Sequence, residues 1–342
     1  YTETINTFVK IHTDDGLVGL GEASPSPAFT GESVGSIHDA VKLIGSKIIG
    51  EDPFDIGKIH GIMDKFILYN RSAKCAIDEA LYDIMGRASD IPIYDLIGGS
   101  YRDEFSTQRA IPILEPDEMA KMAVKLVGEG YTVFEVKVGL DPKKDVNRVV
   151  AIEDAIGDKA TLIVDANCGW DPMDAVNVLK QIEHYTNILA EQPTRSLDGL
   201  AWIRDKISIP IIADESLFTP EDALQIIKKD AADIMSMKLL KAGGFYECLK
   251  IRAICDTAGI PYRIDDMAVT KVGNTASAHL AWSSKDIVGC GVAQHFFLTK
   301  KLKILKSGGV NIADGMAVAP DGPGLGLEVD DEVLGEPDFT VE

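Results

Sequence analysis

From about residue 107 to residue 300, short apolar runs alternate with longer segments in which apolar residues recur at a helical period. The short runs predict buried strands, and the longer segments predict amphipathic helices. The predicted strands are 110–114, 133–138, 161–165, 188–191, 211–214, 234–238, 262–265 and 287–292. The predicted helices between them include 117–129, 171–184, 220–229, 245–258 and 272–281. Eight such units favour a closed parallel barrel over a doubly wound sheet, which usually has fewer strands.

The segments on either side of this repeat have different patterns. Near the start, the alternating runs NTFVKIHT and GLVGLGEA flank Asp14-Asp15-Gly16 and predict a β-hairpin. Two helices are predicted after it, around 36–49 and 73–88. After Lys300, glycine-rich stretches predict loops and short strands that return to the N-terminal part. We therefore expect an α/β protein in three parts: an α+β capping domain (1–104), a (β/α)7-8 TIM-type barrel (105–305) and a C-terminal return (306–342).

Five consecutive strands of the predicted barrel each carry a charged residue at or next to their carboxyl end: Lys137, Asp165, Glu191, Asp214 and Lys238. A single acid after a strand is more often the N-cap of the next helix. Three acids at the same position of consecutive units weaken that interpretation, because all strand C-termini of a parallel barrel meet at one mouth. Carboxylates without histidine or thiolate favour Mg²⁺, with Mn²⁺ as an alternative, over zinc.

The two lysines predict proton transfer beside this metal site. If the barrel order holds, Lys137 and Lys238 lie on opposite sides of the mouth, so either could act as a base toward the α-carbon of a bound carboxylate. Burial and a nearby cation are expected to lower both lysine pKa values. Asn167 and Glu215 are expected to support the metal ligands. A Schiff-base lysine of an aldolase-like barrel is the alternative, and it needs no triad of acids.

Composition narrows the possible partners and the compartment. The formal net charge of −20 argues against nucleic acid, because phosphate binding needs a basic face. No apolar run approaches the roughly 20 residues that span a bilayer. The five cysteines are scattered without a zinc or disulfide spacing, which favours a reduced, cytoplasmic protein. The expected partner is a small-molecule carboxylate.

Several motifs together carry a resemblance that covers nearly the whole chain: DDGLVGLGEASP, AKCAIDEALYDIMGR, VDANCGW, AEQP, IADES, KLLKAGG and DGPGLG. With them the chain resembles the enolase superfamily, in the muconate lactonizing enzyme branch of the mandelate racemase/muconate lactonizing enzymes. The resemblance implies Asp165, Glu191 and Asp214 as Mg²⁺ ligands and Lys137 and Lys238 as the acid/base pair. It also implies that two cap loops close over the substrate, one around 22–32 and one around 69–72 that includes Tyr69. A further implication is assembly into dimers or octamers.

Two departures from the family pattern concern the substrate site. Glu135 stands where this branch usually has lysine; we expect it to pair with Lys241 or to face the helical layer, and a glutamate there would raise the pKa of Lys137. Ala293-Gln294-His295 replaces an Asp-x-Asp that holds the ammonium of dipeptides, so a dipeptide of the usual kind is not expected. His295 is a candidate for lining the mouth, with a packing role as the alternative. Candidate contacts for a cationic substrate group are Asp265 and Asp266.

The resulting hypothesis is a Mg²⁺-dependent enzyme that removes the proton α to a carboxylate and passes through an enediolate. Two lysines on opposite faces favour a racemase or epimerase of an amino-acid-like or proline-like acid. A muconate-type cycloisomerase and an acid dehydratase use the same residues and stay open, because fold and catalytic frame do not fix the overall reaction. A relative that binds Mg²⁺ and a carboxylate without turnover is the non-enzymatic alternative.

Overall fold

The computed structural model describes residues 5–285, 287–292 and 304–342, and the chain begins with the predicted hairpin. Strands β1 (Thr7–His12) and β2 (Val18–Ala23) pair antiparallel around the turn at Asp14-Asp15-Gly16. The helices that follow are α1 (Val34–Ile48), α2 (Ile56–Phe66), α3 (Arg71–Ser89) and α4 (Ile93–Leu96). The sequence prediction missed α2. Its segment contains two glycines, and its N-cap Asp55 makes no side-chain capping hydrogen bond, so the local helix signal is weak.

Helix α3 lies directly on the hairpin because β2 carries glycine where the two backbones meet. A Cβ atom on Gly19 would lie 2.0 Å from the carbonyl oxygen of Ala80, and one on Gly21 would lie 1.9 Å from that of Ala76. Any side chain at these positions would force α3 away from the sheet. The elements β1 to α4 are called the cap below.

All eight predicted strands of the central repeat are present. The strands are β4 (Arg109–Ile111), β5 (Val133–Lys137), β6 (Thr161–Asp165), β7 (Ile188–Glu191), β8 (Ile211–Ala213), β9 (Ile234–Lys238), β10 (Tyr262–Asp265) and β11 (Ile287–Cys290). The helices between them are α5 (Pro116–Gly128), α6 (Pro142–Ile156), α7 (Pro172–Ile182), α8 (Leu197–Arg204), α9 (Pro220–Lys229), α10 (Leu239–Ala242), α11 (Phe245–Ala258) and α12 (Lys271–Trp282). The prediction differs from the structure mainly at the ends of the first and last strands.

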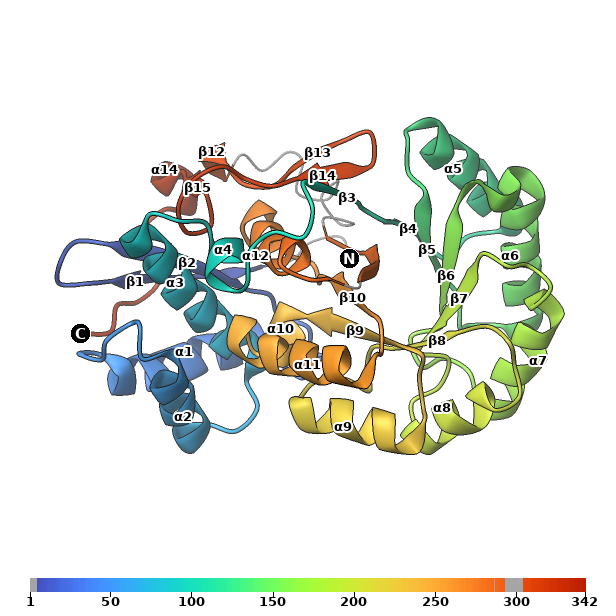
Figure 1. Ribbon diagram of the computed structural model, residues 1–342, viewed down its shortest axis with the longest axis horizontal. Coiled ribbons are helices and arrows are strands. Elements are labelled where there is room, and N and C mark those ends of the chain that lie inside the picture. Colours follow the sequence, from blue (N-terminus) through green and yellow to red (C-terminus); the bar gives the residue numbers. More distant parts are fainter. Residues whose placement is uncertain (1–4, 286, 293–303) are drawn as a thin grey trace.

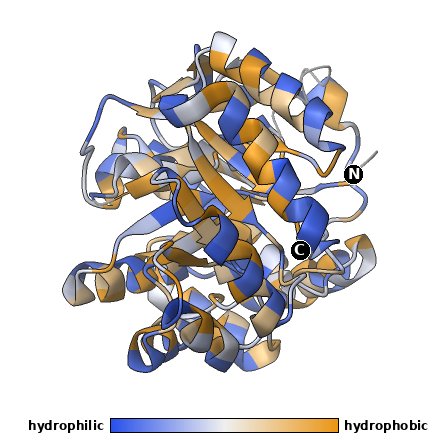
Figure 2. Ribbon diagram, turned by 90° about the vertical axis from the view of Figure 1, so that its right-hand side faces the viewer, coloured by the Kyte–Doolittle hydropathy of each residue, from blue (hydrophilic) through white to orange (hydrophobic). Residues whose placement is uncertain are grey.

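The strands form one curled parallel sheet in the order β11-β10-β9-β8-β7-β6-β5-β4, with the helices on its outside (Figure 1). A backbone hydrogen bond of 2.9 Å from the Gln108 N–H to the Cys290 carbonyl joins the two ends of the sheet. The central strands are largely hydrophobic, whereas the helices alternate hydrophobic and hydrophilic residues (Figure 2). This is the TIM-type α/β barrel that the alternating pattern predicts.

The barrel interior changes from apolar to charged along the strands. Near the amino ends the inward side chains of Ile163, Ile212 and Ile234 form a small hydrophobic cluster with Val133 and Leu189. Because side chains alternate along a strand with a period of two, the same inward faces carry the charged residues two or four positions later. The apolar cluster closes the bottom of the barrel and leaves the charged layer at the mouth.

Buried acids of the cap attach it to the barrel by capping barrel helices. The Glu22 carboxylate accepts hydrogen bonds from the Thr270 and Gly273 N–H groups at the start of α12, both at 2.8 Å. The Asp78 carboxylate accepts from the Phe245 and Tyr246 N–H groups at the start of α11. Anionic groups at helix N-termini satisfy otherwise unpaired donors and the helix dipole. The cap is thereby held over the carboxyl ends of the strands.

The C-terminal segment returns to the cap, as predicted from its turns. Figure 1 draws it in red beside the cap, and the Phe339 ring packs at 5.4 Å from His38 of α1. Its elements are β12 (Leu305–Gly308), β13 (Asn311–Ala313), β14 (Met316–Val318), β15 (Leu327–Val329) and α14 (Asp331–Leu334), and β14 pairs with β3 (Glu104–Ser106). Among the described residues, no helix combines the length and the apolar character needed to cross a membrane.

Candidate active site

The structure brings the five predicted strand-end residues to one mouth of the barrel. Lys137, Asp165 and Glu191 are direct neighbours in the register of β5, β6 and β7. Asp214 follows the last residue of β8, and Lys238 ends β9. Three strands separate β5 from β9 in the sheet of eight, so the two lysines enter the mouth from opposite sides.

Lys137 is held between two carboxylates. Its ammonium donates to Asp165 Oδ2 at 2.5 Å and forms an ion pair with Glu135 on its own strand. Its side chain keeps 28% of its surface exposed, while both acids are almost fully buried. The lysine tip therefore reaches the open part of the mouth and the acids lie beneath it.

On the opposite side, Lys238 lies between Asp214 and Asp265. Its Nζ is 2.8 Å from Asp214 Oδ2 and 3.0 Å from Asp265 Oδ2. Lys241, from α10, donates to Asp214 Oδ1 at 2.6 Å, to the Asp214 carbonyl at 2.6 Å and to the Ser236 carbonyl at 2.9 Å. Both Asp214 oxygens thus accept hydrogen bonds from buried ammonium groups.

The expectation for Glu135 is wrong. Instead of pairing with Lys241 or facing the helical layer, Glu135 points into the barrel. There it forms an ion pair with Lys137 and accepts a hydrogen bond from the side-chain amide of Gln108. The reason is the strand period: Lys137, two residues later, faces the interior, so Glu135 must do so too. Lys241 is already fully engaged by Asp214 and Ser236.

Sequence reasoning also missed Arg263, a fully buried cation of β10. Its Nη1 lies 2.5 Å from Glu191 Oε2, and its Nη2 lies 2.7 Å from Gln108 Oε1, 3.3 Å from Asp265 Oδ2 and 3.7 Å from Glu135 Oε2. The sequence does contain a signal, because Arg263 and Asp265 share the inward face of YRID. An arginine inside a buried strand is rare unless acids pair with it.

Without the contribution of a cation, both lysine pKa values shift upward, opposite to the lowering predicted for the metal-bound mouth. Burial alone would lower the pKa of Lys137, but Asp165, Glu135 and Glu191 raise it further than burial lowers it. Asp214 and Asp265 likewise raise the pKa of Lys238 well above its usual value, against the effect of burial. The prediction combined desolvation with a bound cation, and of the surrounding carboxylates it counted only Glu135, which it expected to raise the pKa of Lys137.

The pKa shifts of the acids differ according to how many cations face each one. Burial raises the pKa of Glu191 well above its usual value, although Arg263 opposes this. Burial also raises the pKa of Asp165, against Lys137. For Asp214, the pair Lys238 and Lys241 outweighs burial and lowers the pKa. Of these three acids, Glu191 and Asp165 are therefore the ones whose negative charge is less compensated.

The remaining predicted residues fall into four situations. Asn167 and Glu215 lie at the mouth, where the Asn167 N–H donates to Asp165 Oδ1 at 2.8 Å and its amide donates to Glu215 at 3.1 Å. Asp266 is buried next to Asp265. Tyr69, in the loop before α3, is 76% exposed. His295 lies outside the described residues.

An aromatic pair covers the side of the mouth that carries Lys238. Phe29, from the cap loop between β2 and α1, has its ring centroid 5.9 Å from that of Phe218, which follows β8. The Nζ of Lys238 lies 5.3 Å from the Phe29 ring centroid, and the Nζ of Lys241 lies 5.8 Å from that of Phe218. The cap therefore supplies an apolar cover above Lys238, as the predicted role of the cap loops requires.

The acids at the mouth fit a divalent cation. One carboxylate oxygen each from Glu135, Asp165 and Glu191 lies within 4.8 Å of the others, and all three residues are buried. Glu191 Oε1 is buried and has no hydrogen-bond partner among the described residues. Buried acceptors are rarely left unpaired, so this oxygen indicates a missing positive partner. Clustered carboxylates without nitrogen or sulfur ligands favour Mg²⁺ or Mn²⁺.

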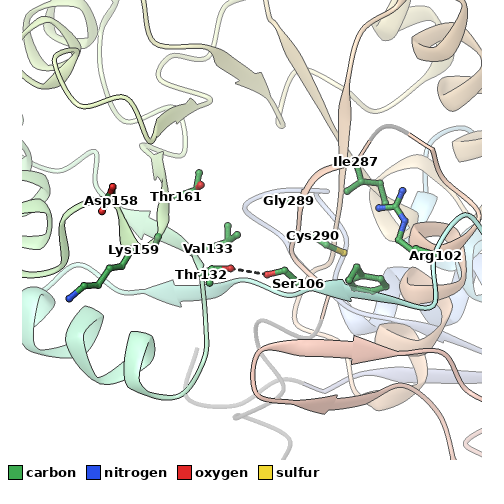
Figure 3. Close-up of a pocket in the computed structure, with 12 residues that line it drawn as sticks. Arg102, Ser106, Thr132, Val133, Asp158, Lys159, Thr161, Ile287, Gly289 and Cys290 are labelled. Atoms are coloured by element: carbon green, nitrogen blue, oxygen red, sulfur yellow. Dashed lines mark hydrogen bonds between the residues drawn. The ribbon is translucent and has the colours of Figure 1, made fainter.

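A cavity lies at the opposite end of the barrel. Its described lining residues do not include the clustered carboxylates and lysines of the mouth. It measures about 380 Å³ and is lined by residues that include Val133, Thr161 and Ile287, which begin β5, β6 and β11 (Figure 3). None of the predicted site residues that the structure describes lines it. Active sites of parallel barrels lie at the carboxyl ends of the strands, so the charged mouth remains the candidate site.

Comparison with known proteins agrees with this fold and site. Residues 2–98 match the mandelate racemase / muconate lactonizing enzyme N-terminal domain, and residues 118–333 match the enolase C-terminal domain-like family. The chain is 42% identical over 285 residues to a hydrophobic dipeptide epimerase of Enterococcus faecalis, covering 82% of this chain and 80% of that protein. It is 35% identical over 341 residues to an N-succinyl-L-Arg/Lys racemase of Bacillus cereus, covering 98% and 91%.

A solved structure extends the similarity to three dimensions. The Enterococcus faecalis dipeptide epimerase complexed with Mg and the dipeptide L-Leu-L-Tyr superposes with a TM-score of 0.89 at 39% identity, covering 94% of this chain and 91% of that one. Together, the barrel, its cap and the charged mouth define an enolase-type enzyme architecture. The chain belongs to the mandelate racemase/muconate lactonizing enzyme family of the enolase superfamily.

Proposed function

We propose that this protein is a Mg²⁺-dependent isomerase that racemises or epimerises the α-carbon of an amino-acid-like carboxylate. The observation that carries the proposal is the placement of Lys137 and Lys238 on opposite sides of one mouth, with buried carboxylates between them. A base on each face of the α-carbon is what inversion in both directions requires. The relatives named above, an epimerase and a racemase, support the same reaction class.

By resemblance, Asp165, Glu191 and Asp214 would hold the cation. Mg²⁺, when bound, would supply positive charge for the substrate carboxylate and for the enediolate that forms when the α-proton leaves. Asn167 would keep Asp165 oriented through its backbone N–H, and Glu215 would keep the Asn167 side chain in place.

The two lysines would exchange roles according to the enantiomer bound. One takes the α-proton as a neutral amine, and the ammonium of the other gives a proton to the opposite face of the α-carbon. The acids around each lysine favour the ammonium, which is the donor form. The base form becomes accessible when those acids are engaged by other cations, so the same carboxylates control the protonation of both catalytic groups.

The substrate class follows from the surroundings of the lysines. The Phe29–Phe218 pair excludes water above Lys238 and offers an apolar surface to a substrate side chain. Asp265 and Asp266 are the candidate contacts for a cationic substrate group, as in amino-acid-like or proline-like acids. The expectation against a usual dipeptide rests on residues 293–295, outside the described residues, and stays a prediction. We also expect a homo-oligomer in the cytoplasm.

The test is α-proton exchange in D₂O with Mg²⁺, followed by NMR. The panel would contain dipeptides, N-acyl amino acids, proline betaines, sugar acids and muconates. Exchange with inversion and no other product supports the proposal, and the exchanging compound identifies the substrate class. Loss of water or lactone formation would indicate a dehydratase or cycloisomerase, and no exchange with any compound despite Mg²⁺ binding would indicate a binding protein. In the same assay, Lys206→Met, at an exposed lysine, is the matched control for the variants Lys137→Met and Lys238→Met.

A further inference from the structure

Glu135 is a buried carboxylate of the mouth to which the proposed reaction assigns no contact with the substrate or the cation. It lies in the middle of β5, on the inward face, and only 2% of its surface is exposed. It sits one inward position below Lys137 and faces the same interior as Asp165 and Glu191. An ionised group in this position needs positive partners, because the barrel interior offers little solvation.

The distances among the three acids suit one shared cation. Their ligand oxygens lie within 4.8 Å of one another. In octahedral coordination at 2.0–2.1 Å, two oxygens on the same Mg²⁺ are roughly 3 to 4.2 Å apart. Small rotations of the carboxylates would therefore bring Glu135, Asp165 and Glu191 onto a common ion.

A second observation at the same place is the unpaired oxygen of Glu191. Arg263 holds Glu191 Oε2 at 2.5 Å, whereas Oε1 is buried without a hydrogen-bond partner among the described residues. Arg263 thus fixes the direction of the carboxylate and leaves one oxygen available. The free oxygen belongs to the same acid that lies within reach of Glu135 and Asp165.

Charge balance separates this group from Asp214. Asp214 and Asp265 face two ammonium groups, Lys238 and Lys241, at distances of 2.6–3.0 Å. In contrast, among the described residues the three acids of the other group contact two cationic side chains, Lys137 and Arg263, and Arg263 is shared with Asp265. The group that includes Glu135 carries the excess negative charge, and a divalent ion binds most favourably where that excess lies.

We propose that Glu135 is a further ligand of the divalent cation, in addition to the carboxylates that the proposed function already assigns to it. The inference rests on the proposed function only in that both use the same ion. It gives a role to the glutamate that stands where the family usually has a lysine. It also implies that the metal competes with Lys137 for the oxygens of Glu135, so metal binding and the position of this lysine are coupled.

The experiment is a titration of metal-free full-length protein with Mn²⁺ alone, with free Mn²⁺ measured by electron paramagnetic resonance. Glu135→Gln is compared with Asp265→Asn, which removes one negative charge from another buried position of the same barrel. A ligand role predicts that the Mn²⁺ Kd rises at least tenfold in Glu135→Gln and no more than about threefold in Asp265→Asn. Equal effects in the two variants, or a Glu135→Gln Kd within twofold of wild type, would overturn the inference.

A crystal of the wild-type protein grown with Mn²⁺ gives an independent answer that does not depend on how the variants fold. The anomalous peak is expected at bonding distance from a Glu135 oxygen as well as from Asp165 and Glu191. A peak bound by Asp165, Glu191 and Asp214, with Glu135 out of reach, would refute the Glu135 assignment and leave the proposed function intact. Absence of Mn²⁺ binding by wild type would instead remove the basis of both.

Discussion

Replacing Arg263 with methionine tests how the charges of the mouth are balanced. The guanidinium is fully buried and contacts Glu191 at 2.5 Å, Gln108 at 2.7 Å and Asp265 at 3.3 Å. Methionine fills much of the volume and removes the charge, which leaves these acids with less compensation. We expect the metal-free variant to fold and to be less stable than wild type.

The size of the effect follows from the partners. Removing one member of a buried ion pair costs about 3–5 kcal/mol. The lower end applies here, because burial raises the pKa of Glu191 and that acid can take up a proton when its partner is lost. For 342 residues, an unfolding entropy of about 2.1 cal/mol/K per residue gives roughly 0.7 kcal/mol/K, so about 3 kcal/mol lowers the Tm by about 4 °C.

Magnesium should recover part of this loss. A divalent ion bound to the same acids restores positive charge, and it no longer meets repulsion from the guanidinium. If the ion binds tenfold more tightly, the added stabilisation is about 1.4 kcal/mol, which raises the Tm by about 2 °C more in the variant than in wild type. The assay is thermal unfolding in EDTA and in saturating Mg²⁺, for both proteins.

The matched control is Arg148→Met. Arg148 is also buried and pairs with Asp145 at 2.7 Å, but it lies on α6 and contacts none of the candidate site residues. The Arg148→Met variant should lose about as much stability as Arg263→Met, and its Tm should respond to Mg²⁺ as that of wild type does. The reasoning is refuted if Arg263→Met loses less than about 1 kcal/mol in EDTA, or if its Mg²⁺ response does not exceed that of wild type.

Three further predictions concern catalysis, pH and the cap. Lys137→Met and Lys238→Met should each lower kcat/KM for racemisation at least about a thousandfold, while each variant still exchanges the α-proton of one enantiomer in D₂O; retention of full racemisation in either would contradict its role. Burial lowers the pKa of His279 from 6.5 to about 4, so the contribution of the neutral ring to the free energy of unfolding is complete above pH 6.5 and is lost as the pH falls to 4. In urea unfolding, His279→Gln should show roughly 3 kcal/mol less acid destabilisation than wild type over that pH range, and an unchanged profile would disprove this. Asp78→Ala leaves the first N–H groups of α11 and the His60 ring unpaired, and should lower the free energy of unfolding by about 3 kcal/mol; a loss below about 1 kcal/mol would show that water replaces the carboxylate.

The sequence predicted the barrel because its signals are local and repeated. Each buried parallel strand is a short apolar run, and each helix has its own period and often its own cap, as at α9, where Thr219 and Asp222 form a capping box before Pro220. The ends of the strands then place Lys137, Asp165, Glu191, Asp214 and Lys238 at one mouth by topology alone. Helix α2 was missed although its apolar residues recur at a helical period; its two glycines lower the intrinsic helix propensity, and Ile59 and Met63 pack with residues of α1 and α3.

The tertiary structure decided what the charges at the mouth do to one another. The strand period of two put Glu135 inside the barrel next to Gln108, which precedes the neighbouring strand β4. Its other partner, Arg263, comes from β10, which is distant in sequence and approaches β5 only after the sheet curls. The tertiary structure also set the direction of the lysine pKa shifts, because these depend on the distances from each lysine to the acids of its own and nearby strands. Local pattern thus determined which residues reach the mouth. Contacts between side chains of different strands determined their ion pairs and pKa shifts. The distances matter strongly there because the barrel interior is poorly solvated.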